Sequence, residues 1–287
     1  MKSKSTNRFI LATIFVWAAY SVFVISVFTL TRTDNKLPVY WEISSSNQFR
    51  GYVVPSIHLS KFSYRTRLGT LLNNVDAVAL EINLGEFDKK IGGFNLTGGD
   101  LENILSKEAV AYYRNLFGGQ EWNYMKTLKP AVLSSYVDNF LAQKGGAVNE
   151  MDRDAFEEAV ALNKKVVGLE DIESQAGFLL ENDTDSIKSL ETVANNQTEY
   201  MRSFGFVEEI YQKGDVELMR ALYNLDANGS TETKYSISVR DPILQRRSAE
   251  ELKNQKTLII VGFAHVPGII DKLKMGFDVK EVNSVRK

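Results

Sequence analysis

The length, composition and charge of the chain exclude several classes of protein. Its 287 residues are 44% hydrophobic and 24% charged, which is enough apolar material for a large folded domain and too much for a mainly disordered chain. The formal net charge of −2 offers no attraction to phosphate backbones, so we expect no binding to nucleic acid. The absence of cysteine excludes disulfides, cysteine-ligated zinc and thiol nucleophiles.

The N-terminal residues predict a membrane anchor. Lys2, Lys4 and Arg8 precede an uncharged run over residues 9–30. At a helical rise of about 1.5 Å per residue, this run is long enough to cross a hydrocarbon core about 30 Å thick. A cleaved signal peptide is the alternative, but its apolar region is usually about 7 to 15 residues and no small-x-small cleavage site is evident after Leu30. We therefore favour an uncleaved anchor.

The charges before this run predict the orientation of the chain in the membrane. Basic residues that flank a span stay in the cytoplasm, so the chain after the span is expected outside. We expect residues 1–31 to form a cytoplasmic tip and transmembrane helix, residues 32–38 a polar linker, and residues 39–287 one extracytoplasmic domain. The protein would then be a single-pass membrane protein, and the sequence leaves its oligomeric state open.

Apolar runs and turn-forming residues predict the elements of the first half of this domain. In chain order, they are a hairpin over 39–43 and 49–54, a short helix over 67–74, a strand over 75–81 and a helical insertion over 85–150. Glycine pairs separate the short helical stretches of the insertion.

The second half alternates helices and strands. In chain order, we expect a helix over 151–163, a strand over 166–170, one long helix through 187–204 followed by further helix over 207–225, a helix from Asp241 to about 254, a strand over 257–261, a helix over 267–275 and a strand over 277–282. Asp241 and Pro242 form a typical helix start, with a capping side chain and a proline in the first turn. The pattern predicts an α/β fold with a mixed or largely parallel central sheet and helices on both faces.

Both histidines of the chain stand in the same setting. Residues 53–58 read Val-Val-Pro-Ser-Ile-His and residues 260–265 read Ile-Val-Gly-Phe-Ala-His, so each histidine follows an apolar run that ends in a turn. Glu81 and Glu170 end two further strand-like runs. Because ligands of α/β sheets bind at the carboxyl ends of strands, we expect these four side chains to share one edge of the sheet.

Two histidines with one or two glutamates, and no cysteine, suit a divalent ion such as Mn²⁺, Co²⁺ or Zn²⁺ with an open position for water. Such an ion lowers the pKa of bound water from about 15.7 to about 7, as amide or ester hydrolysis requires, and a carboxylate outside the ligand set accepts the proton. The alternative is metal-free. There, His58 is the general base, Glu81 orients it and His265 stabilises an oxyanion.

Each of these residues also has a structural interpretation. A single histidine is more often a hydrogen-bonded structural residue, and Glu81 fits a solvated edge-strand acid. Glu170 fits an acidic loop with Asp171 and Glu173. Arg240 fits a salt-bridge partner at a helix start, although it would also serve as a clamp for a carboxylate or oxyanion. The repeated setting favours a functional role for the histidine pair.

Several segments match the pattern of one known family in the correct order. They are residues 52–58, 77–81, 151–159, 167–170 with Gln175, Tyr211 with Gly214 and Asp215, 240–241, and 261–265 with Gly268. In these segments the chain resembles the TraB/PrgY, GumN and Tiki group, an α/β superfamily marked by two G-x-x-H motifs. The resemblance extends from about residue 39 to residue 282.

The resemblance implies a site and a class of activity. It places His58, Glu81 and His265 at the centre, with Glu170 and Arg240 as supporting catalytic members. We expect the first three to be the ligands of a bound metal ion. Animal Tiki proteins are described as membrane-anchored, metal-dependent proteases that trim a secreted signal protein, and PrgY-type members restrain peptide pheromones at bacterial surfaces. Related erythromycin-esterase-like enzymes are regarded as metal-free, so the resemblance leaves metal dependence open.

One residue departs from the family pattern. Pro55 stands where the first G-x-x-H motif has glycine, and proline fixes φ near about −65° and lacks an N–H. We therefore expect an altered turn, and activity that is weakened or lost.

The sequence as a whole predicts a membrane-anchored, metal-dependent peptidase that acts on an extracytoplasmic peptide or protein. The first alternative is a non-catalytic surface module that sequesters a peptide signal. The second is a membrane-tethered structural domain in which both histidines are incidental.

Overall fold

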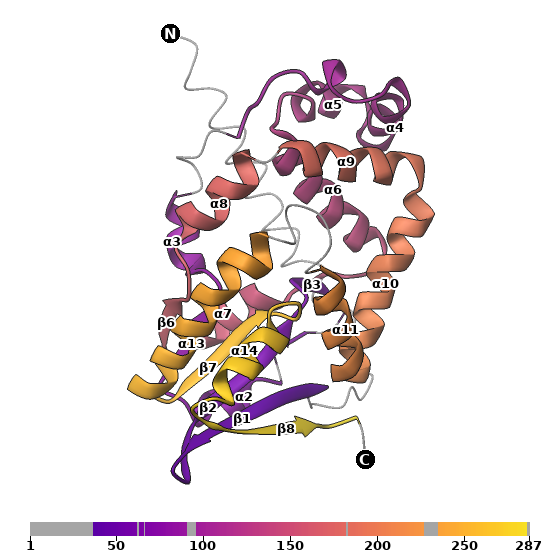
Figure 1. Cartoon of the computed structure of the whole chain (residues 1–287). Coiled ribbons are helices and arrows are strands. Elements are labelled where there is room, and N and C mark those ends of the chain that lie inside the picture. The colour runs from indigo at the N-terminus through magenta and orange to yellow at the C-terminus, as the bar shows by residue number, and fades with distance from the viewer. Residues whose placement is uncertain are drawn as a thin grey trace. The chain divides into compact units, whose positions relative to one another are not determined.

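A six-stranded sheet with the order β6-β4-β7-β2-β1-β8 lies at the centre of the domain in the computed structural model (Figure 1). The structure describes residues 37–61, 63–65, 67–90, 96–181, 183–226 and 235–285. The strands of this sheet are β1 Val39–Ser45, β2 Gln48–Ser56, β4 Ala77–Leu80, β6 Lys165–Gly168, β7 Thr257–Gly262 and β8 Asp278–Asn283. Two short strands, β3 Leu59–Ser60 and β5 Asn149–Glu150, form a separate pair.

Four neighbouring strands of the sheet are parallel. In the register of β6, β4, β7 and β2, Leu80 lies opposite Gly168 and Ile260, and Ser56 lies opposite Gly262. The β1 strand is antiparallel to both of its neighbours. The carboxyl ends of the four parallel strands therefore meet at one edge, and the expected α/β fold with a mixed, largely parallel sheet is confirmed.

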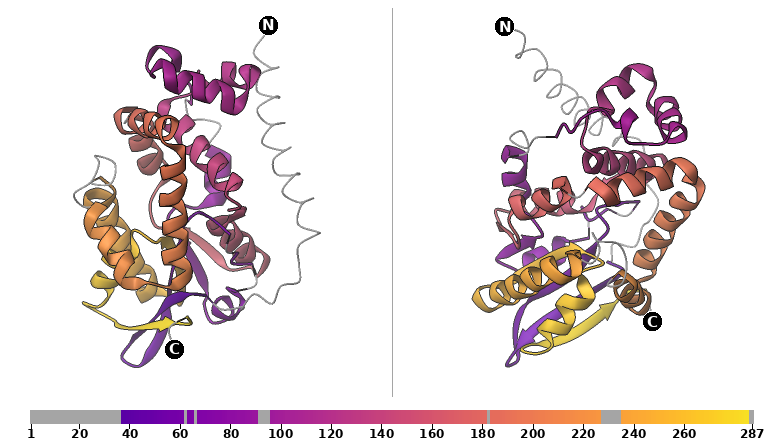
Figure 2. Two further views of the ribbon diagram at one scale, coloured as in Figure 1. Left: turned by 90° about the vertical axis from the view of Figure 1, so that its right-hand side faces the viewer. Right: turned by 45° about the horizontal axis from the view of Figure 1, so that its top comes forward.

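Helices cover both faces of the sheet because right-handed crossovers in opposite directions along a sheet place helices on opposite sides. The helices α2 Gly69–Asn73 and α7 Met151–Ala161 belong to one face, and α13 Asp241–Asn254 and α14 Val266–Leu273 to the other (Figure 2). Every residue of β4 and β7 is buried, as their apolar runs predict for strands covered on both faces.

The other helices form a layer beyond the carboxyl edge of the sheet and beside it (Figure 1). They are α3 Leu84–Lys90, the 3₁₀ turn η2 Leu101–Asn103, α4 Lys107–Phe117, α5 Gly119–Met125, α6 Pro130–Lys144, α8 Ile172–Glu181, α9 Asp183–Asn195, α10 Gln197–Lys213 and α11 Val216–Asp226. Leu190 and Val193 of α9 join Tyr113 and Trp122 in a second hydrophobic core. The expected insertion over 85–150 is therefore completed by helices from a later part of the chain.

The prediction of one long helix through residues 187–204 is wrong, because the helix breaks at Asn196. That residue has φ −149° and ψ 58°, outside the helical region, and its side chain accepts a hydrogen bond from the N–H of Glu199. It therefore caps α10 and separates it from α9. The periodicity of apolar residues continues across the break, which is why the sequence pattern did not reveal it.

The predicted membrane anchor lies outside the described residues. No helix in the part of the chain that the structure describes is long and apolar enough to cross a membrane.

Gly51 lies where β2 approaches β7 very closely. Its φ is +151°, and a Cβ at this position would lie 1.9 Å from the carbonyl oxygen of Thr257. We expect Gly51→Ala to push the two strands apart and to lower the free energy of unfolding by at least about 2 kcal/mol, measured by urea denaturation. Gly69→Ala is the control, because a Cβ on Gly69 meets nothing within 4 Å. Its effect should stay within about 1 kcal/mol, and equal losses in both variants would contradict the steric argument.

Candidate functional site

The carboxyl ends of β2, β4 and β7 bring His58, Glu81 and His265 together around Gly262. A Cβ built on Gly262 would lie 2.9 Å from Oε1 of Glu81, 3.6 Å from Cδ2 of His265 and 3.8 Å from Nε2 of His58. Both imidazole rings therefore have an atom within 4 Å of one point beside a carboxylate. The absence of a side chain at Gly262 keeps this point open.

Glu81 is buried, and both of its carboxylate oxygens accept hydrogen bonds. Oε1 accepts the N–H of Gly262 at 2.6 Å, and Oε2 accepts from the guanidinium of Arg240 at 2.8 Å. The same guanidinium also binds Glu170, with Nε 3.1 Å from each carboxylate oxygen and a further short contact from Nη2. Arg240 thus joins two buried acids, and the five residues expected in the site lie in one cluster.

Two aspartates that the sequence argument did not assign to the site contact the histidines. Nδ1 of His58 lies 2.5 Å from the carboxylate of Asp152, in the first turn of α7. Nδ1 of His265 lies 2.5 Å from the carboxylate of Asp241, the first residue of α13. A carboxylate on Nδ1 fixes the orientation of the ring and leaves Nε2 for the site. The available signal was that each aspartate lies inside a segment matching the family pattern.

The capping role expected for Asp241 is wrong. Helix α13 begins at Asp241 with Pro242 in its first turn, as expected, but a π-helical turn over Ser236–Arg240 precedes it. Arg240 is therefore already helical, with φ −73° and ψ −44°, and α13 has no side-chain cap. Because the backbone ahead of α13 is helical, the carboxylate of Asp241 is available to His265 instead.

The two histidines differ in exposure but share acidic surroundings. The side chain of His58 is 68% exposed, whereas that of His265 is 8% exposed. The charge of Asp152 is the main cause that raises the pKa of His58 to about 9, and Glu81 contributes in the same direction. Burial opposes the charged form of His265, but Glu81 and Asp241 raise its pKa. The site is thus open to solvent on the His58 side.

The two glutamates of the cluster have opposite pKa shifts. Burial acts to raise the pKa of Glu81, but the positive charges of His265, His58 and Arg240 together lower it to about 2. Burial raises the pKa of Glu170, and Arg240 only partly offsets this effect. One carboxylate therefore stays ionised while the other holds a proton more readily.

Pro55 lies within β2, one residue before its end, instead of in the turn that follows. Near this end of β2, the last residue that pairs with β1 is Val53. On the side of β7, the carbonyl of the next residue, Ser56, accepts a hydrogen bond from the N–H of Phe263 at 2.7 Å. The carbonyl of Pro55 accepts a hydrogen bond from the hydroxyl of Tyr64. The missing N–H thus falls where β2 has no pairing with β1, and the register of β2 with β7 continues through Pro55.

The donor set suits a divalent metal ion by type, but its atoms are not assembled as ligands. In the described ranges, no group of three or more His, Asp or Glu side chains is arranged to hold an ion. Oε1 of Glu81 lies 3.9 Å from Nε2 of His265 and accepts the N–H of Gly262. Two Nε2 atoms and one carboxylate match a His₂Glu ligand set, so binding of an ion would require some rearrangement of these side chains.

These features define an α/β protein with a histidine–carboxylate site at the carboxyl edge of a parallel sheet. The model of the TraB/PrgY/gumN family matches residues 39–281, so the chain belongs to this family and the resemblance read from its motifs is confirmed. Comparisons with curated proteins and with solved structures gave no match.

The contact between His58 and Asp152 predicts an unusual titration. In His265→Gln the only remaining histidine is His58, so its ring signal in NMR needs no assignment. We expect an apparent pKa of about 9 in chelator, falling toward 6.5 in Asp152→Asn, whereas the remote control Asp278→Asn should leave it unchanged. A raised pKa means that the folded protein binds the proton more tightly than the unfolded chain. The contribution of this proton to folding stability should be complete below pH 6.5 and lost as the pH rises through 9. If the pKa of His58 does not change in Asp152→Asn, the contact with Asp152 is not the cause of the raised pKa.

Proposed function

We propose that this protein is a hydrolase that cleaves a peptide or protein on the extracytoplasmic side of a membrane, with a divalent Mn²⁺, Co²⁺ or Zn²⁺ ion at the strand-end site. The observation that carries the proposal is the arrangement around Gly262. Two imidazoles, each bound through Nδ1 to an aspartate, lie with Glu81 around one open point. A carboxylate behind each histidine is the usual support of a metal-binding imidazole.

Nε2 of His58, Nε2 of His265 and the carboxylate of Glu81 would hold the ion. A divalent ion held there would lower the pKa of bound water and polarise a carbonyl group. The aspartates keep both rings turned toward the site. The raised pKa values of the histidines imply that an ion must displace protons to bind, so its affinity should rise with pH.

Glu170 and Arg240 have complementary roles in this proposal. Burial raises the pKa of Glu170, which suits a group that accepts the proton of an attacking water and returns it to the leaving amine. Arg240 places a positive charge beside the site, where negative charge develops on the carbonyl oxygen of the substrate. The exposed side of His58 is the direction from which a peptide would approach.

The metal-free alternative makes His58 the general base. A histidine with a pKa of about 9 is mostly protonated at neutral pH, so only a small fraction of the protein would have His58 ready to accept a proton there. This mechanism would therefore operate mainly at alkaline pH, which is why we favour the metal-dependent form.

Metal analysis and hydrolysis of a peptide library by the full-length protein test the proposal. We expect about one divalent ion per chain, loss of both the ion and hydrolysis in His58→Ala and in His265→Ala, and no effect of Glu86→Gln, an exposed acid in α3. If both histidine variants keep full peptide affinity while the parent hydrolyses nothing, the chain is instead a sequestering module. Hydrolysis that a chelator does not reduce would support the metal-free mechanism.

The aspartates behind the histidines supply a milder test. We expect Asp152→Asn and Asp241→Asn each to lower ion affinity or activity about 10- to 100-fold without removing a ligand, measured by metal titration and kcat/KM. Asp278→Asn, in β8 away from the histidines, serves as the control. Unchanged ion affinity in both site variants would show that orientation by Nδ1 is unimportant.

We also propose that residues 9–30 anchor the protein, because this uncharged run follows three basic residues. The full-length protein should sediment with membranes and resist extraction at alkaline pH. Deletion of residues 1–31 should release the domain. A soluble mature protein that begins near residue 30 would overturn the anchor in favour of a cleaved signal peptide.

A further inference from the structure

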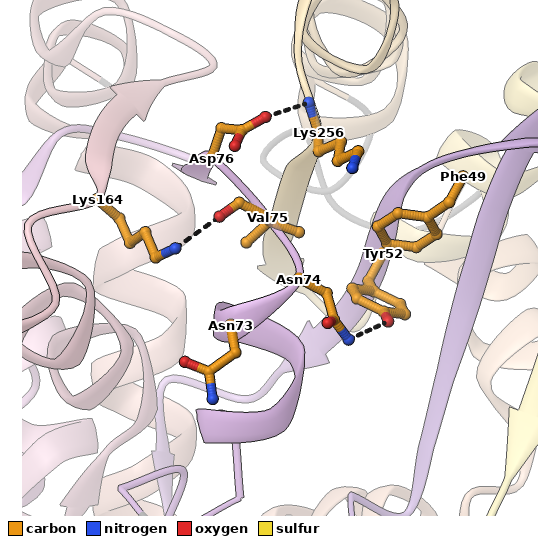
Figure 3. Close-up of a pocket in the computed structure, with 8 residues that line it drawn as sticks. All are labelled: Phe49, Tyr52, Asn73, Asn74, Val75, Asp76, Lys164 and Lys256. Carbon is orange, nitrogen blue, oxygen red and sulfur yellow. Dashed lines mark hydrogen bonds between the residues drawn. The ribbon is translucent and has the colours of Figure 1, made fainter.

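A cleft at the opposite edge of the sheet is separate from the histidine site. It has a volume of about 470 Å³ and is lined by Phe49, Tyr52, Asn73, Asn74, Val75, Asp76, Lys164 and Lys256 (Figure 3). The last four of these precede the amino ends of β4, β6 and β7, whereas Glu81 and Gly262 lie at the carboxyl ends of β4 and β7. The length of the sheet therefore separates the two locations.

Hydrogen bonds between the loops hold the cleft in shape. Nζ of Lys164 donates to the carbonyl of Val75 at 2.8 Å, and the N–H of Asp76 donates to the carbonyl of Lys256 at 2.8 Å. Asn74 donates to the hydroxyl of Tyr52 at 3.1 Å (Figure 3). The lining is thus assembled before any ligand arrives, which lowers the entropy lost on binding.

The polar groups left over in the cleft are mainly hydrogen-bond donors. Among the described residues, Nζ of Lys256 has no hydrogen-bond or ion-pair partner, and Nζ of Lys164 uses one of its three N–H donors on Val75. The hydroxyl of Tyr52 accepts from Asn74 and keeps its own proton for another acceptor. Two lysines against one aspartate give the lining a net positive charge, so the complementary ligand is an anion rich in acceptor oxygens.

Phe49 and Tyr52 supply the apolar part of the cleft. Their ring centroids are 4.8 Å apart with the planes tilted by 56°, and both rings belong to the lining. Tyr52 is buried and supports Phe49, which is partly exposed and offers an edge for a planar group of the ligand. A volume of about 470 Å³ falls within the range of about 300 to 1,000 Å³ that is usual for small-molecule sites.

We propose that this cleft binds a small molecule that carries an oxyanion, a phosphate or a carboxylate, on a planar ring. The oxyanion accepts from Nζ of Lys256, Lys164 adds positive charge to the same lining, and the ring packs against Phe49. This second site does not depend on the hydrolase function, and its ligand makes no contact with the histidine cluster.

Calorimetric titration of the full-length protein in chelator tests the proposal, with phenyl phosphate, benzoate and inorganic phosphate as probes. Comparison of phenyl phosphate with benzoate tells which oxyanion the site prefers. We expect saturable binding that weakens with added salt. Phenyl phosphate should bind about 2- to 10-fold more tightly than inorganic phosphate, because the ring adds contact with Phe49. No saturable binding of either aromatic probe would overturn the proposal.

Variants locate the binding. Lys256→Gln should weaken phenyl phosphate about tenfold or more through loss of a charged hydrogen bond, while Lys253→Gln, in the last turn of α13, should have no effect. Phe49→Leu should lower the affinity for phenyl phosphate toward the affinity for inorganic phosphate. The double variant His58→Ala, His265→Ala should bind as the parent does. Insensitivity to Lys256→Gln, or loss of binding in the histidine double variant, would overturn the proposed location.

Discussion

The parallel pairing of β2 with β7 is the constraint on which the candidate site depends. It aligns Ser56 with Gly262, so that two turns more than 200 residues apart in the chain deliver their histidines to the same edge. Gly51 permits the close approach at one end of this ladder, and Gly262 keeps the space between the rings open at the other. A shift in this register would separate the imidazoles, because each is fixed to its own strand end.

Charge balance around Arg240 explains how the edge tolerates buried acids. A buried carboxylate without a partner is expensive, and its usual response is a raised pKa. The pKa of Glu81 is lowered instead, because Arg240, both histidines and the N–H of Gly262 surround its carboxylate. Burial raises the pKa of Glu170, whose main compensating charge is Arg240. One cation between two acids therefore yields two carboxylates with different proton affinities, which is the asymmetry that acid–base chemistry uses.

The two edges of the sheet differ in chemistry. The carboxyl edge gathers acids and imidazoles, with an aspartate behind each histidine, and the amino edge gathers lysines and aromatic rings. The carboxyl edge fits a proposed divalent ion and a polarised carbonyl, and the amino edge fits a proposed small anion. The strands β4 and β7, buried along their whole length, connect the two edges.

The sequence by itself determined the class of fold, the chain order of the six strands in the central sheet and the family, because buried strands and strand-end motifs depend on local patterns of apolar residues. It also pointed to His58, Glu81, Glu170, Arg240 and His265, although their catalytic and metal-binding roles stay predictions. It did not reveal the short strands β3 and β5. Only the tertiary structure decided the break at Asn196, the use of Asp241 as a partner of His265, the position of Asp152 behind His58, and the cleft at the amino edge. The break at Asn196 is a local cap on the N–H of Glu199, which the continuing apolar periodicity conceals. The other three features depend on contacts between distant segments, and a local pattern carries no information about which side chain arrives from elsewhere.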